Sequence, residues 1–267
     1  MRNTWHLQFE RPELTEEERS FPFSNLYYRP LEGPDANVIY DIEYGAPMDP
    51  KHAILDLKEL LKPGVPERAN GYCYLPNGGA FICVRTMYPG LKIDMYDYWR
   101  KWRFAGNSNA ENQMRYKLWN PGSHVTEMLG TGETIEDIGQ GNILLKIISR
   151  LTPDMLFEKE EFENSPIVGI FGGYGEVGII GDEKQYPYVG LHHTREVEGG
   201  FEIRSMFWFG YTLEDKQLKY VMPEGLELDK DFPYVYVHHS ANEMANLRSL
   251  LPVVWESRPA DAWEEKK

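Results

Sequence analysis

The sequence predicts an α+β fold in which a curved antiparallel sheet wraps a helix near the carboxyl end. From about residue 71 onward, most segments are rich in β-branched and aromatic residues between turn residues, as is typical of strands. Close to the end, apolar residues recur at spacings of three and four, which is typical of one face of a helix: Met244, Leu247, Leu250, Leu251 and Val254. A sheet curved around such a helix would leave a cavity between them.

The region before the strands carries few signals. Thr15 followed by Glu18 predicts a helix start with a capping box. Residues 52–61 predict a short amphipathic helix that Pro63 ends. We expect residues 1–75 to form a small helical subdomain and residues 76–267 to form the main domain.

The rest of the chain predicts mostly strands. A hairpin is expected over Tyr72–Arg85, turning at Asn77-Gly78-Gly79, and a helix over 94–104. Pro252 is expected to kink or end the last helix. The segment 115–124 is expected to begin as a strand and to break at Pro121-Gly122. Further strands are expected at 142–151, 165–172, 186–193, 200–209 and 234–239.

Composition excludes several classes of protein. With 28 basic and 42 acidic residues, the net charge of −14 repels phosphate backbones and disfavours nucleic-acid binding. No run of 18 apolar residues predicts a membrane span, and the first residues predict no secretory signal, so a cytoplasmic protein is expected. In that setting Cys73 and Cys83 are expected to be buried, reduced thiols.

One glycine motif is a false lead. Residues 173–178 fit the pattern G-x-G-x-x-G, but a dinucleotide site needs a helix that opens at these glycines. The residues that follow predict strand or turn, so we expect a loop or bulge beside a cavity instead of a nucleotide site.

His239 and Glu243 form the strongest chemical signal. One turn apart on the last predicted helix, they point the same way and can supply a nitrogen and an oxygen ligand to zinc. Alone, such a pair is more often an ordinary solvated pair on a helix surface. A metal site needs further ligands, and the candidates are His124, one of His192 and His193, and a carboxylate from Glu127, Glu133, Glu136 or Asp137.

Four blocks in this region resemble one known family. The blocks are Arg115-Tyr-Lys-Leu-Trp-Asn-Pro-Gly-Ser-His124, Glu136-Asp-Ile-Gly139, residues 192–210 with R-S-M-F-W, and His239–Pro252 with H-x-x-x-E-M. In this order they are similar to the diacetylphloroglucinol hydrolase and phloretin hydrolase family. The first 80 residues carry no matching motif.

The resemblance implies a fold, an activity and a site. It implies a START-like helix-grip domain, a small amino-terminal domain used in a homodimer, and hydrolysis of the bond between an acyl carbonyl and a phloroglucinol ring. It implies one zinc ion per chain, which polarises the carbonyl and activates water, held by His124, Glu136, His239 and Glu243.

The resemblance also implies roles for cavity residues. Tyr116 would hold a phenolic or carbonyl oxygen, and His192 would transfer protons, with His193 as its alternative. Glu127 and Phe207 stand where relatives bind substrate with an asparagine and a tyrosine, which favours a phloretin-like substrate over diacetylphloroglucinol. The short spacing from His124 leaves Glu133 as a competitor of Glu136.

Two other functions remain open from sequence. A non-catalytic cavity that binds an aromatic molecule would hold no tight metal and form no product. A cupin-type oxygenase would need an H-x-H motif, which the chain lacks.

Overall fold

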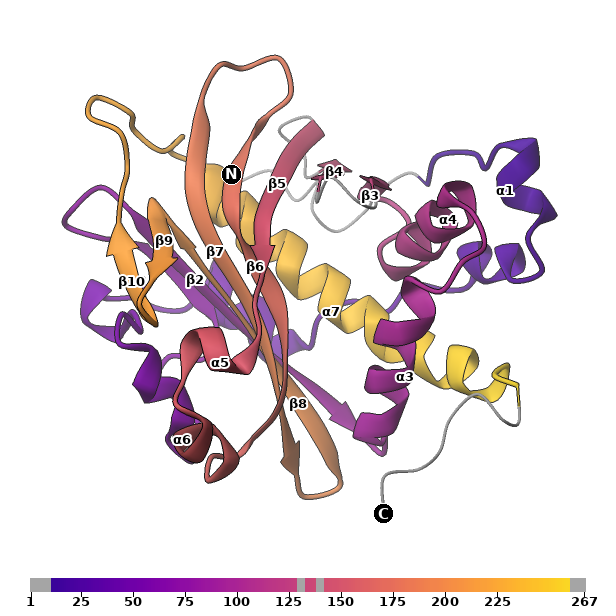
Figure 1. The fold of residues 1–267 in the computed structure, drawn as a ribbon, viewed down its shortest axis with the longest axis horizontal. Coiled ribbons are helices and arrows are strands. Elements are labelled where there is room, and N and C mark those ends of the chain that lie inside the picture. The colour runs from indigo at the N-terminus through magenta and orange to yellow at the C-terminus, as the bar shows by residue number, and fades with distance from the viewer. Residues whose placement is uncertain (1–10, 129–132, 138–141, 260–267) are drawn as a thin grey trace.

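A computed structural model describes residues 11–128, 133–137 and 142–259 (Figure 1). Its main feature is an eight-stranded antiparallel sheet in the order β1-β2-β8-β7-β6-β5-β4-β3. The strands are β1 (Gly71–Tyr74), β2 (Ala80–Pro89), β3 (His124–Met128), β4 (Glu133–Asp137), β5 (Asn142–Arg150), β6 (Ile167–Ile179), β7 (Gln185–Val197) and β8 (Gly200–Phe209). A separate two-stranded sheet is formed by β9 (Tyr211–Glu214) and β10 (Gln217–Tyr220). The large sheet and the carboxyl-terminal helix confirm the predicted α+β class.

The longest helix, α7 (Phe232–Glu256), runs along one face of the sheet (Figure 1). The other helices are α1 (Glu16–Ser20), α2 (Ala36–Glu43), α3 (Ile93–Arg103), α4 (Asn109–Trp119), α5 (Pro153–Leu156) and α6 (Lys159–Glu163), with 3-10 turns η2 (Ser24–Tyr28), η3 (Pro50–His52) and η4 (Leu57–Leu61). The helices α3 and α4 contact the carboxyl-terminal half of α7.

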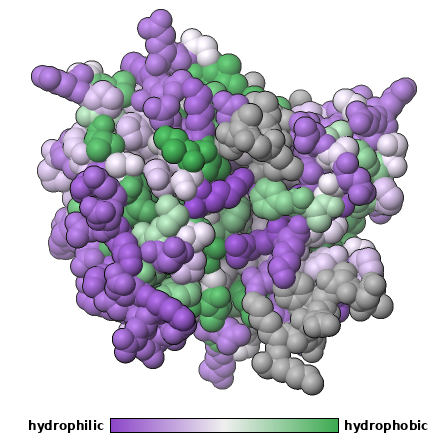
Figure 2. All heavy atoms as spheres, in the orientation of Figure 1, coloured by the Kyte–Doolittle hydropathy of each residue, from purple (hydrophilic) through white to green (hydrophobic). Residues whose placement is uncertain are grey.

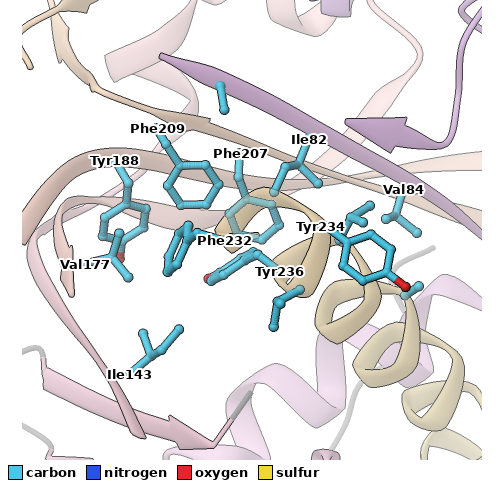
Figure 3. Packing of buried hydrophobic residues seen from close by; sticks show 14 of the residues in the cluster. Ile82, Val84, Ile143, Val177, Tyr188, Phe207, Phe209, Phe232, Tyr234 and Tyr236 are labelled. Carbon is cyan, nitrogen blue, oxygen red and sulfur yellow. The ribbon is translucent and has the colours of Figure 1, made fainter. Parts of the chain in front are cut away.

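Both faces of the sheet are covered. On the inner face, alternate residues of the strands, such as Ile82 and Phe207, pack against Tyr236 of α7 (Figure 3). On the outer face, Trp208 lies in a second cluster with Leu57 of η4. Each fully buried large apolar side chain contributes about 1.5–3 kcal/mol, so the inner cluster holds α7 firmly against the strands that carry the site.

The segment 234–239, predicted as a strand, is helical. The helix α7 begins at Phe232, with Pro233 in the first turn, where the missing N–H costs nothing. Every residue from 232 to 241 is buried. This half of the helix is enclosed on all sides, so it has no solvent-facing polar side. Its sequence therefore lacks the helical period of hydrophobic residues.

The segment 115–124, also predicted as a strand, is mostly helical. It forms the end of α4, whose start is capped by the Ser108 hydroxyl accepting from the N–H of Glu111 at 3.1 Å. The strand β3 begins only at His124. Residues 52–61 contain the turns η3 and η4 in place of the predicted helix.

Other local predictions are confirmed. Thr15 and Glu18 form the capping box of α1, and the hairpin at 72–85 is present as β1 and β2. Cys73 and Cys83 are buried and free. No helix opens at the G-x-G-x-x-G glycines, as expected, but the loop predicted there is wrong, because they lie within β6, which pairs with β5 and β7. Pro252 does not end α7, which continues to Glu256.

The surface seen in Figure 2 is mostly polar, with hydrophobic residues in small separate groups. In the part of the chain that the structure describes, no helix is long and apolar enough to cross a membrane.

Candidate metal centre and its cavity

Four ionisable side chains from three elements converge between the sheet and α7. His124 and Glu136 face each other across β3 and β4, while His239 and Glu243 lie one turn apart on α7. His239 Nε2 is 3.2 Å from Glu136 Oε2 and 3.7 Å from Glu243 Oε2. His124 Nε2 is 3.4 Å from Glu243 Oε2 and 3.9 Å from Glu136 Oε1. The structure thus brings together the four residues that the resemblance implied as ligands.

This cluster fits a divalent metal ion. One atom each from His124, His239 and Glu243 lie within 4.8 Å of one another, and all three residues are buried. Two ligands at zinc distances of about 2.0–2.1 Å lie about 3.3 Å apart on a tetrahedral ion, close to the separations here. Within the described residues, His124 Nε2 and Glu136 Oε2 are buried without a hydrogen-bond partner. Buried polar atoms are rarely left unpaired, so a cation would complete their coordination.

Contacts around the cluster orient its imidazoles. His124 Nδ1 donates to the backbone carbonyl of Tyr116 at 3.1 Å, which leaves the Nε2 lone pair facing the cluster. His239 Nδ1 shares a hydrogen bond of 3.0 Å with the Ser123 hydroxyl. Such partners fix the tautomer of a metal-binding histidine.

Tyr116 supports two members of the cluster at once. Its ring stacks on the His124 ring with centroids 4.0 Å apart, and its hydroxyl donates to Glu136 Oε1. Burial alone would raise the pKa of Glu136, but the facing His239 and His124 and the Tyr116 hydroxyl together lower it to about 2. Glu136 therefore stays an anion, which is the form that binds a cation.

Glu133, the competing carboxylate, points elsewhere. Alternate residues of a strand share a face, so Glu133 and Glu136, three apart on β4, lie on opposite faces. Buried Thr134 shares the face of Glu136 and lines the same cavity. The geometry thus favours Glu136 over Glu133 as the ligand.

A cavity opens beside the cluster between the inner face of the sheet and α7. Its walls combine aromatic side chains with polar ones, among them His192, Arg103 and Arg150. Three glycines of the central strands, Gly172, Gly173 and Gly190, also line it. The aromatic members are Tyr116, Trp119, Phe171, Tyr188, Phe207 and Tyr236.

His192 faces this cavity from β7. A hydrogen bond of 2.8 Å joins its Nδ1 to the Ser205 hydroxyl on β8, so its Nε2 is the nitrogen left for the cavity. Burial lowers its pKa to about 4, against the opposing effect of Glu243 and Glu136. The imidazole is therefore neutral near pH 7.

The remaining predicted residues are placed differently. His193, adjacent on β7, is buried on the opposite face of the sheet, beside Arg195 and Arg204. Phe207 lines the cavity. Glu127 lies in β3, and its side chain is outside the described residues.

Arg103, Tyr188 and Tyr236 are among the cavity residues that sequence reasoning missed. A signal existed for the two tyrosines. Tyr188 lies four residues before His192 on one strand face, and Tyr236 lies three residues before His239, close to one helical turn. The second signal was hidden because that part of α7 was predicted as a strand.

The low pKa of His192 makes metal-free stability depend on pH. Its folded value of about 4 lies below the unfolded value of 6.5, so the unfolded chain binds more protons between these values. The free energy of unfolding therefore decreases as the pH falls through this window, by up to about 3 kcal/mol.

Between pH 7 and pH 4, we expect the free energy of unfolding of metal-free His192→Gln to decrease less than that of the wild type, as measured by urea unfolding. Parallel profiles for the two proteins would contradict the buried, neutral state of His192.

Comparisons with known proteins agree with this site. A family model described as the DAPG hydrolase PhiG domain matches residues 52–256. The chain is 24% identical over 267 residues to a phloretin hydrolase from Eubacterium ramulus, covering 91% of this chain and 92% of the relative. It is 24% identical over 229 residues to a 2,4-diacetylphloroglucinol hydrolase from a Pseudomonas species, covering 75% of each. Because the family match spans most of the chain, the protein belongs to the family of the DAPG hydrolase PhiG domain and is a hydrolase.

Proposed function

We propose that the chain is a zinc-dependent hydrolase that cleaves the carbon–carbon bond between an acyl carbonyl and a phloroglucinol-type ring. The observation that carries this proposal is a buried cluster of two imidazoles and two carboxylates that opens onto an aromatic cavity. Family membership supports the same reaction class. Diacetylphloroglucinol is the alternative to a phloretin-like substrate, which would give phloroglucinol and an aryl-propionic acid.

Two observations favour the phloretin-like substrate. The phloretin hydrolase aligns with 91% of this chain, against 75% for the diacetylphloroglucinol hydrolase. Phe207 presents a plain phenyl ring to the cavity, which suits an apolar part of a larger acyl group.

The proposal includes the finer features that the resemblance implied. Residues 76–267 would form a START-like helix-grip domain around α7, whose sheet is extended by β1 (Gly71–Tyr74) just before this boundary. Residues 1–75 would form the smaller unit, used in a homodimer, and the protein would act in the cytoplasm on an aromatic small molecule.

His124, Glu136, His239 and Glu243 would hold one zinc ion per chain. When bound, zinc supplies a Lewis acid that polarises a carbonyl and lowers the pKa of water towards ~7. The ionised Glu136 offsets the charge of the cation in this buried place. Tyr116 would keep Glu136 in position through its hydroxyl, besides its proposed contact with a substrate oxygen.

The chain must also move one proton. Hydrolysis adds the hydroxyl of water to the acyl carbon, giving a carboxylic acid, and places a hydrogen on the ring carbon that leaves. His192 is neutral and turns Nε2 to the cavity, so it can accept the proton from water and return it to the ring carbon. Trp119 and Phe171 are aromatic walls that keep bulk water from this transfer.

The test is product formation. Incubation of the purified protein with phloretin and, separately, with diacetylphloroglucinol should give phloroglucinol and an aryl-propionic acid from the first compound at the higher rate. Mass spectrometry of the mixture identifies the products. A chelator should stop the reaction, and added zinc should restore it. Binding of both compounds without product would instead indicate a non-catalytic binding protein.

A further inference from the structure

Two tyrosines bring their rings to the cavity wall, one from the sheet and one from α7. Tyr188 on β7 is 3% exposed and Tyr236 on α7 is 2% exposed, and both line the cavity (Figure 3). Among the described residues, neither hydroxyl has a hydrogen-bond partner, and neither is sealed off from the cavity. Both are therefore polar groups that are nine-tenths buried and open only to this space.

Two other buried tyrosines of the chain do have protein partners for their hydroxyls. The buried hydroxyl of Tyr88 donates to the carbonyl of Met244 at 2.8 Å, and that of Tyr27 donates to the carbonyl of Pro121 at 3.0 Å. Burying a hydroxyl without a partner costs free energy. Within the described part of the chain, the hydroxyl of Tyr96 is also unpaired, but it is sealed in the core and does not line the cavity. The two cavity tyrosines are the ones whose unused hydrogen-bonding capacity a ligand in the cavity can reach.

The two hydroxyls lie close to the reacting centre. The Tyr236 ring is 5.7 Å from the His239 ring, centroid to centroid, and 4.8 Å from the ring of Phe207. Glu136 is near enough to both tyrosines to raise the pKa of each, in addition to the larger effect of burial. Both groups consequently remain protonated and can donate as well as accept.

We propose that the hydroxyls of Tyr188 and Tyr236 bind a phenolic hydroxyl of the substrate and so select hydroxylated aromatic compounds. The inference rests on the proposed function and assigns a role that its mechanism does not use. A phenol is itself both donor and acceptor, so it matches two neutral hydroxyls. The aromatic walls suit the ring that carries this hydroxyl.

The phenolic hydroxyl could belong to the phloroglucinol ring or to the aryl end of the acyl group. Two pairs of unreactive probes distinguish these sources. Phloroglucinol and resorcinol differ by one ring hydroxyl, and 3-(4-hydroxyphenyl)propionate and 3-phenylpropionate differ by the aryl hydroxyl. Calorimetry would measure the affinity of each probe for the zinc-loaded wild type, for Tyr188→Phe and for Tyr236→Phe.

In one of the two pairs, we expect the wild type to bind the probe with the additional hydroxyl more tightly. Each variant should lose about 3- to 10-fold of that preference, the effect of one hydrogen bond. The pair that responds identifies the end of the substrate concerned. Tyr186→Phe is the matched control, because Tyr186 lies on the same face of β7 but does not line the cavity. Its probe preferences should equal those of the wild type.

Thermal unfolding checks the fold of the variants. Because the two hydroxyls have no partner to lose among the residues that the structure describes, Tyr188→Phe and Tyr236→Phe should melt no lower than the wild type. Unchanged preferences for both probe pairs in both variants would overturn the inference. That result would leave the hydrolase proposal intact, since product formation from phloretin is measured separately.

Discussion

Replacing His239 by alanine is expected to reduce the zinc content of the purified protein from about one ion per chain to a small fraction of that value. His239 Nε2 lies within 3.7 Å of both Glu136 and Glu243. Its loss removes one of four converging ligands and leaves His124 as the remaining imidazole of the cluster beside two buried carboxylates. The rate of phloretin hydrolysis should fall in proportion to the zinc content. Plasma mass spectrometry of the metal, alongside the hydrolysis rate, measures both effects.

His238→Ala is the matched control for this loss. His238 is the adjacent residue and is equally buried, but its Nε2 contacts Glu43 of α2 at 2.6 Å on another side of α7. This variant should lose stability but keep its zinc. Equal zinc contents in His239→Ala and the wild type would show that the cluster on α7 is not the metal site.

Replacing His192 by glutamine is expected to lower kcat for phloretin by about 10²- to 10⁴-fold, the usual contribution of a positioned acid–base group. Zinc content should stay unchanged, because His192 supplies no ligand to the cluster. The measurement is steady-state hydrolysis of phloretin together with metal analysis of the same preparation.

His193→Gln provides the comparison for that variant. Its imidazole lies on the outer face of the sheet, so its removal should change stability without a comparable effect on kcat. If the two variants lose similar activity at full zinc content, proton transfer by His192 is ruled out.

The sequence predicted which residues would form the proposed metal site better than it predicted the helices and strands on which they lie. His239 and Glu243 show their helical spacing directly, because the residues after them have a clear apolar period. The first ten residues of α7, 232–241, are all buried. Apolar and polar residues therefore do not alternate there with the helical period that would indicate a helix. A strand was predicted there because tertiary packing, not local pattern, determines this half of the helix.

The placement of His124 beside Glu136 could not be derived from spacing. The two residues meet because β3 and β4 pair in one particular register, with a bulge between His124 and Thr126. The neutrality of His192 was equally hidden, since it results from burial against the sheet and not from its neighbours in sequence. Both properties depend on contacts between segments that are distant along the chain.

The position of His124 and Glu136 on β3 and β4, the last two strands at one end of the sheet, has a consequence for folding. An ion shared with His239 and Glu243 would cross-link this edge to a helix more than a hundred residues away in sequence. Such a link exists only after both partners have assembled, so its binding free energy stabilises the complete native state alone. The metal would then act as a reversible cross-link. After its removal, β3 and β4 would unfold locally before the central strands of the sheet unfold.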